Sequence, residues 1–188
     1  MKKLYLVHGW GGGPASEPWF NWLKKECEKR DIEFIAPQMP DTNSPIMAKW
    51  VSKLSETINN LDEETYLVGH SMGCLAIINY LSKLENPKVS KIVLVAPWIE
   101  LDESSIEEEG QESVEIVREW IKKPVDFTNA KNSTDKILSI FSDNDPFVTL
   151  SNINFFREKL DTEIIIKNNE EHFNKTKQIN EIIEFIEK

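Results

Sequence analysis

Short apolar runs alternate with amphipathic stretches along this chain, and the alternation predicts its fold. The apolar runs lack polar alternation and are rich in valine and isoleucine, which is typical of parallel strands covered on both faces. Six of them predict strands at residues 4–7, 32–36, 66–68, 92–95, 137–141 and 163–166. Helical spacing or a helix-start signal predicts helices at residues 18–30, 45–61, 71–84, 150–160 and 176–186. This order indicates an α/β fold with a doubly wound, mostly parallel six-stranded sheet and helices on both faces.

One segment interrupts the alternation. Residues 98–133 contain no predicted strand, only an acidic loop, a predicted helix at 111–122 and a polar stretch. A departure of this length inside a compact domain is usually a functional lid or an excursion over one face. It follows the predicted strand at 92–95, and ligands bind at the carboxyl ends of strands in open α/β sheets. We therefore predict a single domain over residues 1–188, with a small acidic excursion at about 98–133 over the C-terminal edge of the sheet.

Composition limits the class of protein. The chain has 188 residues, of which 40% are hydrophobic and 29% charged, as expected for one globular domain. Its two cysteines form no paired motif, which argues against a disulfide framework or a structural zinc site and favours a reducing compartment. The first strand begins at once, and no apolar run approaches the length of a membrane span. We expect a cytoplasmic protein without a secretion signal.

The net charge of −10 argues against nucleic acid or an anionic membrane as a partner. Much of this charge lies in residues 100–119, which hold nine acidic side chains and one basic side chain. One interpretation is a solvated surface segment. The other is an acidic cover over a ligand site, which would favour neutral or cationic substrates over anionic ones.

Residues 66–81, YLVGHSMGCLAIINYL, place a serine where an apolar strand gives way to a helix. So sharp a turn forces its central residue into a crowded backbone conformation and requires small neighbours. Gly69 and Gly73 flank Ser71 in the G-x-S-x-G spacing of a nucleophile elbow. The pattern predicts Ser71 as a catalytic nucleophile.

A catalytic serine needs a histidine as its base and an acid that orients the histidine. In elbow-type hydrolases the order is serine, acid, histidine, and His172 alone among the three histidines follows Ser71. Asp143 and Asp145 both follow the predicted strand at 137–141. We favour Asp145 as the acid, because the proline after it disfavours a helical backbone. Asp143 suits an Asx hydrogen bond in the turn.

The oxyanion hole needs two backbone N–H groups. Met72, directly after the predicted nucleophile, supplies one, and the glycine-rich loop at residues 8–13 supplies the other through Trp10. A phosphate-binding loop is the competing interpretation, but the P-loop and dinucleotide patterns are missing from the sequence. We expect His8 to shape this loop and His70 to be structural.

Two aromatic residues and one cysteine allow more than one interpretation. Trp10 and Trp98 follow strand ends on the expected active face, so they belong either to an apolar substrate pocket or to the core. Cys74 lies one helical turn from Ser71 and suggests a thiol mechanism. We favour the interpretation that Cys74 is a small buried residue of the helix.

Four ordered motifs, HGWGG, GHSMG, SDNDPFV and EHF, together resemble the α/β-hydrolase superfamily. The small size and the DNDPFV form are similar to the compact serine hydrolases typified by retinoblastoma-binding protein 9. The resemblance covers essentially the whole chain. It implies a serine hydrolase fold without a large cap domain, a triad of Ser71, Asp145 and His172, and esterase or aminopeptidase-type activity. Ser142 departs from the pattern, since many hydrolases carry glycine there.

We therefore expect a serine hydrolase that cleaves ester or amide bonds of small molecules or short peptides through an acyl-enzyme intermediate. This chemistry requires no metal and no cofactor. One alternative is a hydrolase-fold protein that acts mainly by binding another protein, with residual catalysis. Another is acyl transfer to an acceptor other than water. A protein partner and the oligomeric state are left open.

Overall fold

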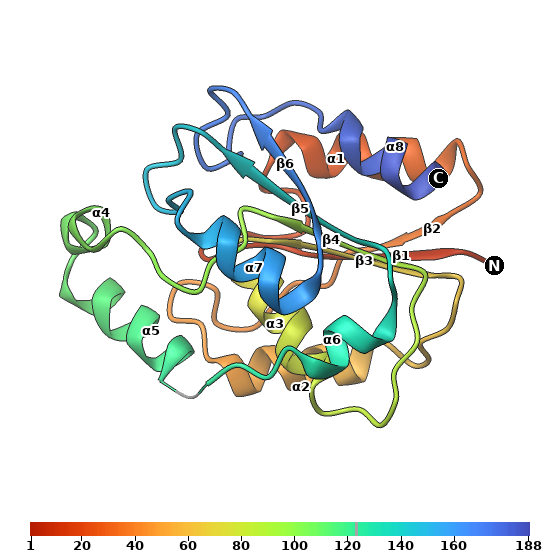
Figure 1. The fold of residues 1–188 in the computed structure, drawn as a ribbon, viewed down its shortest axis with the longest axis horizontal. Helices are drawn as coiled ribbons and strands as arrows, with labels where there is room; N and C mark the ends of the chain where they lie inside the picture. The colour runs from red at the N-terminus through yellow and green to blue at the C-terminus, as the bar shows by residue number, and fades with distance from the viewer. Residues whose placement is uncertain (123) are drawn as a thin grey trace.

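A six-stranded parallel sheet forms the centre of the computed structural model, which describes residues 1–122 and 124–188 (Figure 1). The strands lie in the order β2-β1-β3-β4-β5-β6, and every neighbouring pair is parallel. Their bounds are β1 Lys3–Val7, β2 Glu33–Ile35, β3 Thr65–His70, β4 Lys91–Val95, β5 Ile137–Ser142 and β6 Glu163–Lys167. The predicted α/β fold with six strands is confirmed.

Helices cover both faces of the sheet (Figure 1). They are α1 Pro18–Glu28, α2 Met47–Thr57, α3 Met72–Leu81, α6 Thr128–Ser133, α7 Asn152–Leu160 and α8 Asn180–Glu187. The first and last of them, α1 and α8, lie on one face, whereas α2, α3 and α6 lie on the other and α7 contacts α6. Prediction placed the start of the last helix four residues too early, at residue 176.

Burial differs between the central and the edge strands. The residues of β1, β3, β4 and β5 are buried almost throughout, as the apolar runs predicted. The two edge strands β2 and β6 are partly exposed, and Ile166 in β6 is 46% exposed. The apolar runs therefore predicted the buried central strands well, whereas the two edge strands, which have a neighbouring strand on one side only, are less buried than their sequences suggest.

The segment between β4 and β5 contains two further helices, α4 Glu103–Glu108 and α5 Gln111–Ile121. The helix predicted at 111–122 is therefore confirmed, whereas the short helices α4 and α6 were not predicted. In Figure 1, α4 and α5 lie beyond the carboxyl ends of the strands, and α6 lies under the sheet. Residue 123 of the expected excursion is outside the described residues.

A buried lysine ties the sheet to the C-terminal helix. Lys91, at the start of β4, is 4% exposed, and its ammonium donates to the carbonyl oxygens of Phe185 and Ile186 at 2.7 and 2.8 Å. These carbonyls belong to the last turn of α8, where no intrahelical donor is available. The ammonium also lies 5.5 Å from the centre of the Phe185 ring. Lys91 therefore caps α8 from the sheet.

Within the described ranges, no helix combines the length and the apolar character needed to cross a bilayer.

Candidate active site

Ser71 occupies a strained turn between β3 and α3. Its φ and ψ are 52° and −118°, a conformation that residues with a side chain rarely adopt. The turn brings α3 against β1 so closely that a Cβ on Gly73 would lie 2.1 Å from the Val7 carbonyl oxygen. Only glycine fits there, which is the physical reason for the last residue of the G-x-S-x-G spacing. The Ser71 side chain makes no capping hydrogen bond to α3 and lines a pocket.

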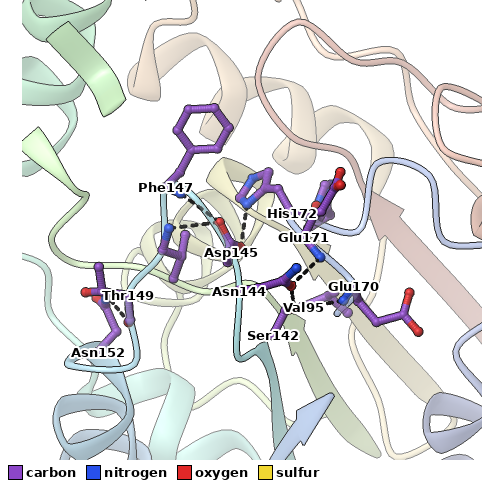
Figure 2. Close-up of polar contacts among 12 residues, drawn as sticks. Val95, Ser142, Asn144, Asp145, Phe147, Thr149, Asn152, Glu170, Glu171 and His172 are labelled. Carbon is purple, nitrogen blue, oxygen red and sulfur yellow. Dashed lines mark hydrogen bonds and ion pairs between the residues drawn. The ribbon is translucent and has the colours of Figure 1, made fainter. Parts of the chain in front are cut away.

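His172 and Asp145 contact each other as the sequence predicted for a base and its orienting acid. The distance between His172 Nδ1 and Asp145 Oδ2 is 2.7 Å (Figure 2). The other carboxylate oxygen, Oδ1, accepts from the Phe147 and Val148 N–H groups, both at 2.9 Å. Because the carboxylate is an acceptor, the network assigns the ring proton to His172 Nδ1 and leaves Nε2 free to accept one. The Asp145 side chain is 1% exposed and that of His172 12%.

The contact belongs to a ladder between two loops. Four consecutive residues at the end of β5 pair with four consecutive residues after β6, partly drawn in Figure 2. Besides Asp145 and His172, the pairs are Asp143 Oδ1 with the Asn169 N–H at 2.8 Å, Ser142 Oγ with the Glu170 N–H at 3.1 Å, and Asn144 Oδ1 with the Glu171 N–H at 2.9 Å. Asp143 thus caps main chain, as its alternative interpretation suggested, although in the neighbouring loop. Ser142, the departure from the family pattern, also supports that loop.

The loop that carries His172 is strained. Asn169, Glu171 and Phe173 have positive φ values of 57°, 49° and 61°. Each such residue with a side chain costs about 1 kcal/mol relative to an ordinary backbone conformation. We call residues 169–173 the histidine loop. The ladder offsets its strain by satisfying three of its N–H groups.

The two predicted oxyanion donors lie in the same pocket as Ser71 and His172. Trp10 and Met72 both line it. Among the described residues, neither backbone N–H donates to a backbone carbonyl in a turn or loop. Met72 is the first residue of α3, where an N–H group has no acceptor within the helix. The positive end of the α3 dipole faces the same place. The arrangement suits an anion next to Ser71.

The pocket has a volume of about 370 Å³ and largely apolar walls. Its apolar lining consists of Trp10, Met72, Trp98, Leu101, Ile106 and Phe147. The acidic side chains in the lining are those of Glu17 and Glu109, and among the described residues no lysine or arginine lines the pocket. Trp98 is both a pocket residue and fully buried, so the two interpretations of this residue are not exclusive. The lining at 101–113 shows that α4 and α5 contribute to the pocket wall.

The remaining candidates have structural contacts. Cys74 is buried, its thiol donates to the Val95 carbonyl at 3.4 Å, and burial raises the pKa of that thiol. A thiol of this kind is a poor nucleophile. His8 donates from Nδ1 to the Gly9 carbonyl at 2.8 Å and accepts at Nε2 from the Met39 N–H at 3.1 Å, which fits a loop-shaping role. The described part of the chain contains no cluster of three residues that suits a metal ion.

Glu17 is a pocket residue that the sequence did not reveal. It precedes Pro18 at the start of α1 and is 7% exposed. Burial raises the pKa of its carboxyl. An acidic residue before a proline at a helix start is commonplace, so no local signal distinguished it.

A serine at a strained elbow and a histidine that contacts a carboxylate line one pocket of a chain with the α/β-hydrolase fold. The chain belongs to the serine hydrolase family, whose model matches residues 4–184. It is 25% identical to the serine hydrolase RBBP9 of Rattus norvegicus over 186 residues, which covers 98% of this chain and 93% of the relative. It is 35% identical to the putative hydrolase YdeN of Bacillus subtilis over 96 residues, half of each chain.

Solved structures agree on the fold. The YdeN gene product of B. subtilis superposes over the whole of both chains with a TM-score of 0.86 and 23% identity. A structure from the archaeon Nitrososphaera gargenis, in a study of carboxylesterases, covers 99% of this chain and 88% of its own with a TM-score of 0.73 and 15% identity.

Proposed function

We propose that this protein cleaves ester or amide bonds with Ser71 as nucleophile, His172 as general base and Asp145 as the acid that orients the base. The observation that carries the proposal is the 2.7 Å contact between His172 Nδ1 and Asp145 Oδ2 beside the pocket that also contains Ser71. A carboxylate held by two backbone N–H groups fixes the imidazole tautomer in which Nε2 accepts a proton.

The proposed reaction has two steps. Ser71 Oγ attacks the substrate carbonyl carbon as its proton passes to His172 Nε2, and the Trp10 and Met72 N–H groups bind the resulting oxyanion. The C–O or C–N bond then breaks, and His172 returns the proton to the leaving alcohol or amine. In the second step a water gives a proton to His172 and attacks the acyl carbon. The acid leaves, and the proton returns to Ser71.

The pocket supports a substrate with a small apolar acyl group or a short peptide. A volume of about 370 Å³ lies at the small end of ligand sites, and its walls are mainly aromatic and aliphatic. The acidic side chain of Glu109 in its wall favours substrates that are neutral or cationic over anionic ones. Esterase names among the structural neighbours agree with ester cleavage.

Labelling with a fluorophosphonate, read by intact mass, tests the proposal. We expect one adduct on wild type, no adduct on Ser71→Ala, and labelling slowed by about 10³-fold or more in His172→Ala and Asp145→Asn. The Asp145→Asn amide N–H would face His172 Nδ1 and stabilise the wrong tautomer. An adduct that persists in Ser71→Ala would contradict the assignment. The absence of an adduct on folded wild type would favour a protein that acts by binding.

Adding alcohols or amines during turnover separates hydrolysis from acyl transfer. For a hydrolase, we expect the acid product to dominate even at high acceptor concentration. If a new ester or amide is the main product, the added alcohol or amine, and not water, is the acceptor of the acyl group.

A further inference from the structure

His70, the last residue of β3, lies directly before Ser71 and is 1% exposed. The rings of Trp19 and Phe20 lie 5.9 and 6.0 Å from its ring, both nearly perpendicular to it. These contacts with α1 hold the imidazole in one orientation. His70 is therefore a rigid group attached to the elbow.

The ring of His70 contacts the main chain of His172. Nε2 lies 2.9 Å from the His172 carbonyl oxygen, although the two residues are 102 positions apart. A carbonyl oxygen only accepts, so Nε2 carries the proton and donates it. Burial lowers the pKa of His70 to about 3, so the ring is neutral and carries this proton alone. Nδ1 is consequently an acceptor.

Nδ1 lacks a donor among the described residues and is completely buried. Its polar neighbour is Glu17 Oε1 at 3.8 Å, and the other oxygen of this carboxyl accepts from Ser16 Oγ. His172 and His8 are the further titratable groups whose charge acts on His70. A buried carboxyl prefers its protonated form, and a carboxylic acid supplies the O–H that an imidazole acceptor requires. The separation of 3.8 Å exceeds hydrogen-bond distance by about 1 Å, so the contact requires a small closing movement of the Glu17 side chain.

We propose that His70 is a positioning residue for His172, and that it connects the Glu17 carboxylic acid to the main chain of the histidine loop. The inference rests on the proposed function, in which His172 is the base. The ladder from β5 holds residues 169–171 by their N–H groups, whereas His70 holds the carbonyl of residue 172 itself.

The geometry has a direct consequence for the proposed reaction. His70 and Ser71 are neighbours in the chain, so the elbow that presents the nucleophile also holds the residue that accepts its proton. A strained loop released at this contact would let His172 move away from Ser71. A displacement of about 1 Å is enough to lower the rate of the chemical step by about 10²-fold.

Steady-state kinetics with p-nitrophenyl butyrate, a neutral ester, test the role of His70. His70→Leu keeps the size and removes the donor, whereas the amide N–H of His70→Gln lies close to the position of Nε2. We expect His70→Leu to lower kcat by about 10–100-fold with KM within about twofold of wild type, as for other residues that orient a catalytic group. We expect His70→Gln to recover most of that loss.

The same assay tests Glu17. Glu17→Gln keeps a neutral N–H donor beside His70, and Glu17→Leu removes it. We expect the loss of kcat in Glu17→Leu to be severalfold larger than in Glu17→Gln. Equal losses in both would mean that the carboxylate charge, and not a donated proton, is required, and would overturn the role of Glu17.

Leu54→Ala, in α2 and outside the pocket lining, is the matched control for general destabilisation. Removal of this fully buried side chain destabilises the fold without touching the proposed site. Wild-type kcat in His70→Leu, equal losses in His70→Leu and His70→Gln, or an equal loss in Leu54→Ala would each overturn the inference. A fluorophosphonate adduct on wild type, measured in parallel, keeps the proposed function standing in that case.

Discussion

The Asn144 side chain accepts a hydrogen bond from the Glu171 N–H at 2.9 Å, and these two residues directly precede Asp145 and His172. The proposed acid and base are therefore joined by a second contact one residue upstream. Ser142 Oγ donates to the same Asn144 oxygen at 2.9 Å and fixes its orientation. The amide thus holds the histidine loop at a residue with positive φ.

We expect Asn144→Leu to lower kcat by about tenfold with little change in KM, because the loss of an orienting partner loosens the base without altering the pocket. Asn144→Asp keeps an acceptor oxygen at the same place and should retain most of the activity. Steady-state kinetics on a neutral ester measure both variants. Equal activity in Asn144→Leu and wild type would show that the contact between Asn144 and Glu171 is dispensable.

The acidic pocket lining predicts a charge preference. Among matched acyl substrates, we expect a cationic one to have a higher kcat/KM than an anionic one at low ionic strength. The ratio should fall toward one at about 0.5 M salt, where screening acts within a few ångström. Glu109→Gln should reduce the ratio at low salt. The hypothesis fails if the two substrates react equally at both salt concentrations.

His70 predicts a loss of stability in acid. Its pKa is about 3 in the folded protein and about 6.5 in the unfolded chain, so the unfolded chain binds the extra proton between these values. The free energy of unfolding should therefore fall by about 1.4 kcal/mol for each pH unit below 6.5, from this group alone. Above pH 6.5 this group no longer lowers the free energy of unfolding.

Urea unfolding of wild type and His70→Gln from pH 7 to pH 4 measures this contribution. Other groups titrate in both proteins, so the difference between the two curves isolates His70. A difference that does not change with pH would contradict the assignment of a neutral His70.

Lys91 predicts a stability effect without an effect on activity. Lys91→Met keeps the aliphatic stem but leaves the last carbonyls of α8 without their donor, which should lower the free energy of unfolding by about 2–3 kcal/mol. Lys136→Met, an exposed lysine beside β5, is the control and should change it by less than about 0.5 kcal/mol. Urea denaturation followed by circular dichroism compares the three proteins. Similar midpoints for all three would show that the cap contributes nothing.

The order of the strands explains which parts of the site could be predicted. Ser71, Asp145 and His172 each follow a strand that local pattern identifies. In a parallel sheet, the carboxyl ends of all strands meet at one edge. Placement at that edge therefore needed no knowledge of which strands are neighbours. The choice of Asp145 over Asp143 as the predicted acid rested on the local effect of Pro146 on the backbone of Asp145.

Contacts across the sheet were not predictable in this way. The His70 contact to His172 joins the ends of β3 and β6, which are separated by β4 and β5. It depends on the histidine loop folding back over two strands, a tertiary event without a local signal. The pairing of residues 142–144 with 169–171 depends likewise on β5 lying beside β6.

The missed helices have a similar cause. The helices α4 and α6 have six residues each, too few for a periodic pattern and too short to be stable alone. The first is capped by Asp102, which accepts from the Ser105 N–H at 2.9 Å, and the second buries Ala130 and Ser133. Packing in the folded protein stabilises them.

The pocket draws on two parts of the chain. The proposed reacting groups come from loops anchored to the sheet, and the close approach of Gly73 to the Val7 carbonyl packs the elbow of Ser71 against the end of β1. The outer wall comes from residues 101–113, which join the loop after β5 through the Asp102 N–H, a donor to the Phe147 carbonyl at 2.8 Å. Replacement of residues 101–113, in relatives or by grafting, should therefore change which acyl groups the pocket accepts while the proposed reacting groups stay in place.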